Sequence, residues 1–564
     1  MKRPSPPPTP QPPPKPFLIG ALAASLFILH LALGLRFIGS AAPTYDEPVH
    51  LASGYAYLAT GIYRLNAMDH PPLGEMWAAL PLLRWSPNLF RSHPDWSANR
   101  VYHYADTFLY RNKVPAERML NAARRWSLIG WSALFFAALF AWGARLGGPA
   151  AALGALFAFV FQPVLSSNLA LVTTDAASAA FFFLTFFLLA REVRGRGVWL
   201  AAGACAGLAL ASKFNMILLP PLAALLLVLE HRLRPAPRPR FPWLGVLLAA
   251  AAALLALAAV YRFASLPVYG EGLSATLARL ERGRATFLHG SRTLTGSPLF
   301  FPTALALKTP LALLLLALGA AFVRFRKPGR ELLWVLGPAL VYFAAALSAK
   351  VQIGVRHLLP VLPFLALLAG WALGELWKRP WKGRLAAAVL AAWAAVSVLR
   401  AGPHSLAYFN ELAGGPAGGW RWLVDSSLDW GQDLKGLGAW LREQGGPPVY
   451  LSYFGTADPA DYGIRYVPVG FITNCERPGD AVDPAASGRV LFAVSATNLQ
   501  GTYFEEQDLF GWLKRREPLK VFGHALFLYD LSSDAEGRAA LRELVVRAGR
   551  PDAAGALGAG GPGR

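Results

Sequence analysis

Long apolar runs recur along this chain of 564 residues, and they constrain its fold more than any other feature. A helix needs about 20 apolar residues to cross the hydrocarbon core of a bilayer. About eleven runs approach that length, at 17–38, 126–144, 149–168, 176–190, 198–212, 216–230, 241–263, 303–323, 331–348, 355–376 and 383–400. With 55% hydrophobic residues, the chain carries more apolar surface than a water-soluble protein of this size needs. The sequence therefore predicts a mainly α-helical, multi-pass membrane protein.

The ends of the chain and one pair of runs need separate treatment. The runs 198–212 and 216–230 are short and nearly adjacent, so they form either two spans or one re-entrant element. The first run, 17–38, is too long for the apolar region of a cleaved signal peptide, and we predict a retained span. The Pro-rich residues 1–16 are predicted to be a disordered cytoplasmic leader, and the Gly- and Ala-rich residues 551–564 a disordered tail.

Positive charges are concentrated in alternate loops between the apolar runs. These loops contain Arg145; Arg191, Arg194 and Arg196; Arg232, Arg234, Arg238 and Arg240; Arg324, Arg326, Lys327 and Arg330; and Lys378, Arg379, Lys382 and Arg384. They share a side with Lys2 and Arg3, and the positive-inside rule makes that side the cytoplasm. Topology and attraction to anionic lipid therefore explain the formal charge of +21, and no nucleic-acid partner is needed.

The opposite, extracytoplasmic side is predicted to hold the long loop 39–125 and the whole segment after residue 401. An odd number of spans agrees with this, because it places the two termini on opposite sides. We interpret 17–401 as a transmembrane domain and 402–550 as an extracytoplasmic domain of mixed α/β structure. Its expected strands are 449–454, 490–494, 519–522 and 525–529, and its expected helices are 434–443 and 504–515.

Several kinds of site are absent from the sequence. Only Cys205 and Cys475 are present, which excludes a disulfide scaffold and a cysteine-based zinc site, and Cys205 is expected to pack in an apolar core. The chain has no Gly-rich nucleotide-binding loop, no His/Cys cluster with zinc spacing and no Gly-x-Ser-x-Gly elbow. We predict no dedicated metal site, and whether a divalent metal assists is left open.

Ionisable residues gather at the predicted outer membrane boundary, each at the end of a different span or just beyond it. The acids are Asp46, Glu47, Asp69 and Asp175, and the cationic or titratable residues are His70, Lys213, Lys308, Arg356 and His357. Such groups are costly near lipid, so their recurrence at one depth indicates a shared cavity. Four cations beside several carboxylates favour an anionic ligand such as a phosphate or diphosphate.

Each of these residues also has a purely structural interpretation. Asp175 could cap the helix that starts at residue 176, because aspartate accepts hydrogen bonds from free N–H groups at a helix start. Lys213 and Lys308 could extend their ammonium groups to the membrane interface. Arg356 and His357 could be interfacial anchors.

The mixture of charges indicates a specific chemistry. A carboxylate at the membrane surface can act as a general base towards a hydroxyl or amine acceptor. Cations can stabilise the charge that develops on a phosphate leaving group. A lipid-phosphate donor would bring its phosphate to this depth while its tail lies between helices.

Several motifs resemble those of a known family. Asp46-Glu47 after the first span, followed by His70-Pro71-Pro72-Leu73-Gly74, is similar to the first luminal loop of protein O-mannosyltransferases, glycosyltransferase family 39, and of their bacterial relatives. Thr174-Asp175, Lys308-Thr309-Pro310 and the segment from Arg356 to Pro360 resemble later parts of that family. The segments from Tyr408 to Glu411 and from Asp425 to Asp433 resemble its phospholipid carrier-dependent bacterial members.

The resemblance implies the C-type glycosyltransferase fold and an inverting transfer from a polyprenyl-phosphate-linked sugar. Carried over, the catalytic residues are Asp46 as base, Glu47 as its acidic neighbour and Asp175, which would orient the acceptor or the base. Residues expected to bind substrate, above all the lipid phosphate, are His70, Lys213, Lys308, Arg356 and His357. Related aminoarabinose transferases carry a lysine where this chain has His70.

The resemblance also implies that the protein is localised in the bacterial inner (plasma) membrane. Sugar transfer would take place on the outer side of this membrane, during assembly of the cell envelope. The acceptor could be a protein, a lipid or a glycan. A different class of function, a transporter or flippase of lipid-linked sugars, would line a translocation path with the same charges. A transporter favours inverted repeats and polar residues at the bilayer midplane, and the sequence has no evident internal repeat.

Overall fold

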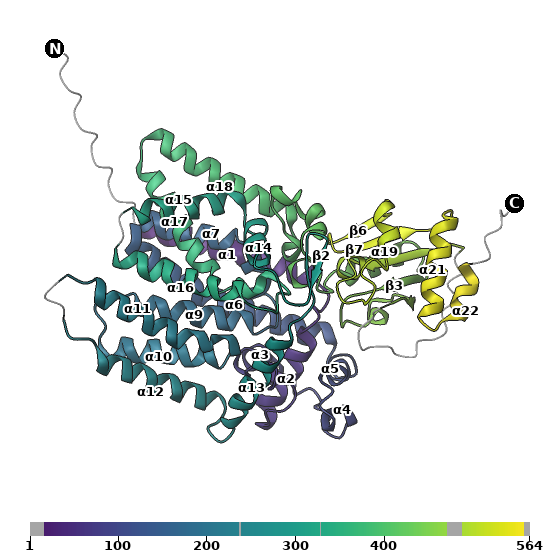
Figure 1. Ribbon diagram of the computed structural model, residues 1–564, viewed down its shortest axis with the longest axis horizontal. Helices are drawn as coiled ribbons and strands as arrows, with labels where there is room; N and C mark the ends of the chain where they lie inside the picture. Colours follow the sequence, from purple (N-terminus) through teal and green to yellow (C-terminus); the bar gives the residue numbers. More distant parts are fainter. Residues whose placement is uncertain (1–15, 236–238, 327–328, 471–487, 558–564) are drawn as a thin grey trace, which may run out of the picture.

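The computed structural model describes residues 16–235, 239–326, 329–470 and 488–557. Figure 1 shows a bundle of helices that joins a smaller part built around a sheet. The predicted leader up to residue 15, Arg238, Lys327, Cys475 and the last residues of the predicted tail lie outside the described residues.

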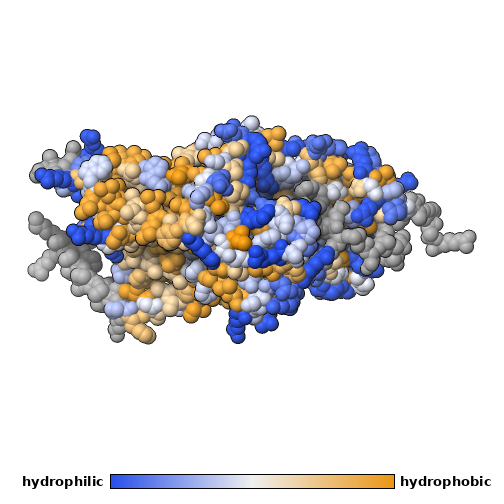
Figure 2. All heavy atoms as spheres, turned by 90° about the horizontal axis from the view of Figure 1, so that it is seen from below, coloured by the Kyte–Doolittle hydropathy of each residue, from blue (hydrophilic) through white to orange (hydrophobic). Residues whose placement is uncertain are grey.

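The helical bundle contains most of the predicted apolar runs. Its helices are α1 (Pro16–Ser40), α6 (Ala116–Gly147), α7 (Pro149–Val160), α8 (Pro163–Leu169), α9 (Asp175–Leu189), α10 (Arg196–Leu210), α11 (Leu219–Leu233), α12 (Trp243–Val260), α14 (Phe300–Lys308), α15 (Leu311–Phe325), α16 (Arg330–Leu347), α17 (Leu362–Lys378) and α18 (Trp381–Ala401). Figure 2 shows hydrophobic side chains covering much of this part, whereas the end with the sheet is mostly hydrophilic. The surface therefore fits a membrane-embedded bundle with a water-exposed end.

Small residues allow close approach between helices in the bundle. A Cβ atom on Gly203 of α10 would lie 2.1 Å from the carbonyl oxygen of Ala249 on α12, and one on Gly207 would lie 2.1 Å from that of Ala253. A Cβ on Gly370 of α17 would lie 2.2 Å from the backbone nitrogen of Ala155 on α7. Helices in a bilayer associate through such close packing, because lipid supplies no hydrophobic driving force between them.

The number of uninterrupted spans is smaller than the eleven predicted. Within the described residues, six helices are long and apolar enough to cross a bilayer, or up to eight if each of two bent pairs counts as one span. The pairs are α7 with α8, bent by 68°, and α14 with α15, bent by 114°. The first break directly precedes Pro163 and the second contains Pro310, because proline lacks the N–H that continues a helix. The prediction of several membrane helices is confirmed, and their exact number is not.

The outer loop 39–125 contains helices of its own. They are α2 (Glu47–Thr60), α3 (Leu73–Ala79), the 3-10 helix η1 (Leu80–Arg84), α4 (Pro94–Ser97) and α5 (Val101–Tyr110). α6 begins at residue 116, ten residues before the predicted start at 126, so the loop is shorter than expected. A second outer segment contains α13 (Pro267–Arg282) and the short hairpin of β1 (Thr286–Leu288) and β2 (Ser291–Thr293).

The part after residue 401 is of mixed α/β structure, as predicted. Its five-stranded sheet has the order β4-β3-β5-β7-β6, with β3 (Val449–Ser452), β4 (Tyr466–Pro468), β5 (Leu491–Ser495), β6 (Lys520–Phe522) and β7 (Leu526–Asp530). β3 is parallel to both neighbours, and β5, β7 and β6 are antiparallel. α19 (Leu434–Glu443) is the predicted helix 434–443, and α21 (Ala535–Arg547) follows the last strand.

Two predictions for this part are wrong. The helix expected at 504–515 is only the 3-10 helix η9 (Gly511–Arg515), since residues 504–510 form turns. The tail expected to be disordered from 551 begins with α22 (Pro551–Ala554) and η10 (Gly555–Leu557). The Tyr450 hydroxyl donates a hydrogen bond of 2.9 Å to the carbonyl of Ala553, so a strand of the sheet holds this segment in place.

Candidate active site

The segment that joins α1 to α2 brings Asp46 to the boundary between the bundle and the C-terminal part. The backbone N–H of Ala42 donates to the carbonyl of Gln432 at 2.8 Å, and that of Tyr45 donates to the carbonyl of Trp430 at 2.9 Å. The Thr456 hydroxyl donates to the carbonyl of Tyr45 at 2.8 Å. The C-terminal part therefore fixes the backbone on which Asp46 is carried.

Glu47 is adjacent to Asp46 but has a different environment. Its carboxylate is buried, and the Arg124 guanidinium contacts both of its oxygens, with Nε at 2.8 Å and Nη2 at 2.5 Å. The backbone N–H groups of Thr44 and Val172 donate to it at 2.9 Å each. Burial raises the pKa of Glu47, but Arg124 and these donors outweigh it and hold that pKa below its ordinary value. Glu47 thus has a structural role: it belongs to the framework, the buried Glu47–Arg124 pair with its backbone donors, and has no oxygen free for a substrate.

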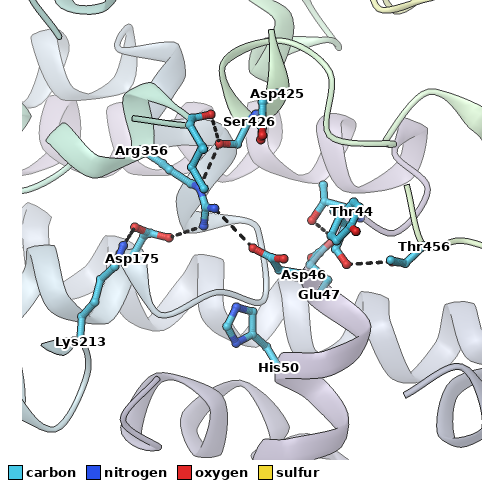
Figure 3. A network of polar contacts seen from close by, with 12 residues as sticks. Thr44, Asp46, Glu47, His50, Asp175, Lys213, Arg356, Asp425, Ser426 and Thr456 are labelled. Atoms are coloured by element: carbon cyan, nitrogen blue, oxygen red, sulfur yellow. Dashed lines mark hydrogen bonds and ion pairs between the residues drawn. The ribbon is translucent and has the colours of Figure 1, made fainter. Parts of the chain in front are cut away.

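Arg356 lies at the centre of the site, between two carboxylates (Figure 3). Its Nη2 lies 3.4 Å from Asp46 Oδ2 and its Nη1 lies 3.3 Å from Asp175 Oδ2. Lys213 Nζ contacts the other oxygen of Asp175, Oδ1, at 2.5 Å. Four of the predicted site residues therefore converge, although they come from α2, α9, the α10–α11 turn and the segment before α17.

This geometry rules out two of the structural interpretations. Thr174, and not Asp175, is the residue that precedes α9, and both Asp175 oxygens are bound to cations instead of to the helix start. Arg356 is buried, with only 6% of its side chain exposed, so it is no interfacial anchor.

The two carboxylates differ in how many of their oxygens are bound. Asp175 is only 3% exposed and both its oxygens contact cations. Asp46 is 21% exposed, and the only hydrogen bond or ion pair of its carboxylate within the described residues is the 3.4 Å contact of Oδ2 with Arg356. Asp46 Oδ1 is therefore free to accept a proton or a hydrogen bond from a bound molecule.

His70 and His357 are at the edge of the cluster. The ring of His70 lies 5.0 Å from that of His50, whose Nδ1 is 2.7 Å from Glu75 Oε1. Burial, His50 and Lys213 lower the pKa of His70 well below its ordinary value, so this imidazole is neutral at pH 7. It can donate one hydrogen bond to a ligand but supplies no positive charge. The backbone carbonyl of His357 accepts a hydrogen bond of 3.2 Å from the Tyr342 hydroxyl, which also accepts one from Asn215.

Lys308 and Asp69 do not join the cluster. Lys308 is 1% exposed, and its ammonium group donates to the backbone carbonyls of Leu406 at 2.8 Å and Ser427 at 2.5 Å. This contradicts the alternative interpretation in which Lys308 extends to the membrane interface, because its ammonium group holds the C-terminal segment. Its predicted binding of the lipid phosphate stays a prediction. Asp69 forms an ion pair with Arg279 of α13 at a half-exposed position.

The segment 425–430 contacts Arg356 and contributes residues to which the sequence assigned no role. Ser426 Oγ accepts a hydrogen bond from Arg356 Nε at 3.0 Å and donates one to the carbonyl of Ile353 at 2.9 Å. The Trp430 ring lies 4.2 Å from the guanidinium carbon of Arg356. The sequence signal for this segment was its resemblance to the phospholipid carrier-dependent members of the family, and that resemblance does not reveal Arg356 as its partner.

No metal cluster is formed by the residues that the structure describes. In those ranges, no group of three or more His, Cys, Asp or Glu side chains is arranged to hold an ion. The site instead presents one carboxylate with a free oxygen beside two buried cations, which suits binding of an anion next to a proton acceptor.

Comparisons with known proteins agree with this description. The family model for dolichyl-phosphate-mannose-protein mannosyltransferases matches residues 121–258. None of the curated proteins matches the sequence. Among solved structures, ArnT from Cupriavidus metallidurans bound to undecaprenyl phosphate is 13% identical, with a TM-score of 0.51 over 91% of this chain and 97% of that chain. The apo form of the Archaeoglobus fulgidus oligosaccharyltransferase is also 13% identical, with a TM-score of 0.47 over 76% of this chain and 58% of that chain.

The match to ArnT covers nearly the whole of both chains, and it shows that this chain has the same fold. The predicted fold class is thereby confirmed, and the match of the family model to residues 121–258 confirms the resemblance to the family 39 transferases. At 13% identity the structural match concerns the fold alone, and roles of single residues need the geometry above.

Proposed function

We propose that this chain, with its match to the mannosyltransferase family and the fold of ArnT, is a membrane glycosyltransferase that takes a sugar from a polyprenyl-phosphate carrier. The family model and the ArnT structure support the class of reaction. ArnT was crystallised with undecaprenyl phosphate, which supports a donor of the same chemical class. The acceptor is a hydroxyl or amine on a molecule that reaches the site from the water-exposed side.

The observation that carries the mechanism is the free oxygen of Asp46. A general base must have an oxygen within hydrogen-bond reach of the acceptor. Asp46 Oδ1 is free for such a contact, whereas both oxygens of Glu47 and both of Asp175 are bound by other side chains or by the backbone. Asp46 is therefore the base in our proposal, and Asp175 holds Lys213 and Arg356 in place.

The proposed step is a single displacement at the sugar carbon that carries the phosphate. The acceptor atom loses its proton to Asp46 and forms a bond to this carbon from the face opposite the phosphate. The bond between the carbon and the phosphate oxygen breaks, and its electron pair leaves with the polyprenyl phosphate. Arg356 and Lys213 stabilise the negative charge that develops there, and attack from the opposite face inverts the sugar carbon. No observation favours the transporter hypothesis over this one.

The proposal is tested by incubating the purified protein with undecaprenyl-phosphate-linked hexoses and pentoses and with candidate acceptors of three kinds, peptide, glycolipid and glycan. Mass spectrometry should show an acceptor heavier by one sugar and the released carrier phosphate. The anomeric configuration of the product, read by NMR, should be opposite to that of the donor. Movement of intact donor across vesicles without any product would instead indicate a flippase.

We also propose that the protein lies in a bacterial inner membrane with its N-terminus in the cytoplasm and the sheet outside. The Arg-rich loops support this orientation. A periplasm-active phosphatase fused to the C-terminus should be active, and a fluorescent protein fused there should be dark. A fusion truncated after Arg379, in the turn between α17 and α18, should give the reverse pattern. The opposite pair of results would overturn the orientation.

Replacing Arg356 should weaken binding of the donor. A lost charge-assisted hydrogen bond costs about 1.5–3 kcal/mol. The apparent dissociation constant for the sugar donor (the donor constant), measured at fixed acceptor concentration, should therefore rise roughly 10- to 100-fold in Arg356→Ala. Arg356→Lys should recover only part of the lost donor affinity. The planar guanidinium group contacts Asp46 and Asp175 with two separate nitrogens, and a lysine ammonium group has only one. The acceptor constant should change little.

Lys308 provides the contrast to Arg356. Because its ammonium group binds backbone carbonyls of the C-terminal segment, Lys308→Met should lower thermal stability and leave the donor constant of the folded fraction near the wild-type value. Equal donor effects in the two variants would show that the phosphate lies nearer Lys308 than we propose.

Ser426 is expected to position Arg356 without touching the substrate. Ser426→Ala removes one neutral partner of Arg356, a loss of about 0.5–1.5 kcal/mol, and should raise the donor constant several-fold while kcat is nearly unchanged. Ser405, a half-buried serine whose buried hydroxyl has no hydrogen-bond partner within the described residues, is the control, and Ser405→Ala should behave like wild type. A fall in kcat alone would contradict the positioning role.

A further inference from the structure

A second group of charged residues lies at the end of the bundle opposite Asp46. α9 begins at Asp175 in the candidate site and runs for 15 residues, or about 22 Å, to Leu189. α10 returns towards Lys213, so the turn between these two helices is far from the site. The C-terminal end of α11 and the start of α12 lie beside this turn, on the left in Figure 1. This end corresponds to the other surface of the membrane.

One buried carboxylate at this end faces three guanidinium groups. Glu230 of α11 is 4% exposed; Arg194 Nη2 lies 2.6 Å from its Oε2, and Arg234 Nη2 lies 3.0 Å from its Oε1. Arg330, at the start of α16, also forms an ion pair with it. A single negative charge cannot neutralise three positive ones, so the cluster keeps a positive surplus.

The cluster borders a cavity of about 180 Å³, much larger than a single water molecule needs. Three arginines, Arg194, Arg234 and Arg240, line it against two carboxylates, Glu192 and Glu230, so a positive surplus remains. His231 also lines it, and Trp199 and Leu227 form an apolar part of its wall. Arg240 has no hydrogen bond or ion pair within the described ranges and remains available to a ligand. The cavity is therefore a cationic pocket with one apolar side.

The neighbouring helix starts strengthen the positive field. α10 begins at Arg196 and α12 at Trp243, next to the lining residues Trp199 and Pro242. The N-terminus of a helix carries unpaired N–H groups and a partial positive charge, which favour an anion.

The surface beside the cavity is suited to acyl chains. Trp243, Leu244 and Leu247 at the start of α12 are 67%, 59% and 64% exposed, and they belong to a helix apolar enough to span a bilayer. An anion held in the cavity would therefore have its chains against α12.

We propose that this cavity binds the phosphate headgroup of an anionic phospholipid. A basic pocket between membrane helices on the Arg-rich side suits such a headgroup. A zwitterionic lipid carries the same phosphate, but its own ammonium group cancels the attraction. The site is separate from the sugar-transfer site and does not depend on the function proposed above.

The experiment is native mass spectrometry of the full-length protein titrated with phosphatidylglycerol or with phosphatidylcholine of the same acyl chains. We expect phosphatidylglycerol to bind at least tenfold more tightly. Arg240→Gln should weaken this binding about tenfold, the loss expected for one charge-assisted hydrogen bond. Arg240 is exposed, so its replacement should leave the fold intact.

Arg232→Gln is the matched control, because Arg232 is an exposed arginine nearby on α11 that does not line the cavity. It should change binding less than twofold. Equal affinity for the two lipids, or an equal loss in both variants, would overturn the proposal by showing only general attraction to charge. A third arm adds inorganic phosphate: if millimolar phosphate displaces the lipid completely, the pocket is a site for a free anion and the assignment to a lipid is wrong.

Discussion

Asp46→Asn is expected to lower kcat for sugar transfer by roughly two to four orders of magnitude, the usual contribution of a positioned general base. Asparagine keeps the shape of the side chain and can still accept a hydrogen bond from Arg356, but it cannot take the acceptor's proton. Since Asp46 is partly exposed and makes only one long contact, thermal stability should be close to that of the wild type. Turnover and unfolding temperature, measured on the same purified sample, check both parts.

Asp95→Asn is the control for this prediction. Asp95 lies in the same outer loop, on α4, and forms an ion pair with Arg100 at 2.7 Å. The Asp95→Asn variant should transfer sugar at nearly the wild-type rate. If Asp46→Asn retained more than about a tenth of wild-type kcat, Asp46 would not be the base.

Glu47→Gln should have the opposite effect, with a large loss of stability. The Glu47–Arg124 pair is fully buried, and removing one partner of such a pair typically costs about 3–5 kcal/mol because the other charge is left uncompensated. We expect a markedly lower unfolding temperature and a reduced yield of membrane-inserted protein. Activity should fall in proportion to the folded fraction.

The pH dependence gives a second test of the Glu47 prediction. The pKa of Glu47 in the folded protein lies below the ordinary value of 4.5, since Arg124 and the backbone donors favour the charged form more than burial opposes it. The stabilisation by ionised Glu47 is therefore fully present above pH 4.5 and is lost as the pH falls through the lower, folded pKa. The difference in stability between wild type and Glu47→Gln should shrink in that acidic range.

Glu117→Gln is the matched control, because Glu117 lies on the same helix as Arg124 but is exposed, and it pairs with the half-exposed Lys435 at 2.7 Å. An exposed pair contributes only about 0–1 kcal/mol, so this variant should unfold near the wild-type temperature. Equal losses for Glu47→Gln and Glu117→Gln would contradict the framework role of Glu47.

The sequence predicted the class of fold and singled out the four residues that meet in the candidate site, because both follow from local patterns. An apolar run of about 20 residues has few alternatives to a membrane helix, since every backbone group must be paired inside lipid. Charged residues at the ends of such runs are exceptional enough to stand out, and Asp46, Asp175, Lys213 and Arg356 were found in that way. All four lie at the ends of different spans, and the structure places them in contact.

The roles within the site could not be read from the sequence, because they depend on which oxygen or nitrogen is already bound. Asp46 and Glu47 are neighbours in the chain, yet α2 directs one towards the site and the other into the framework with Arg124. Lys308 and Arg356 are both cations at span ends, but carbonyls of a distant segment occupy Lys308. Breaks in the helices at Pro163 and Pro310 also changed the span count, since a hydropathy pattern does not register a bend.

By itself, the sequence determined that the protein is a membrane helix bundle with charged residues at one boundary, because burial of apolar side chains in lipid depends only on their spacing along the chain. Tertiary structure alone decided that Asp46 keeps a free oxygen, that Ser426 and Trp430 hold Arg356, and that an arginine-lined cavity lies at the far end. Contacts between residues up to about 300 positions apart set these features, and their strength depends on distances and burial that no local pattern encodes.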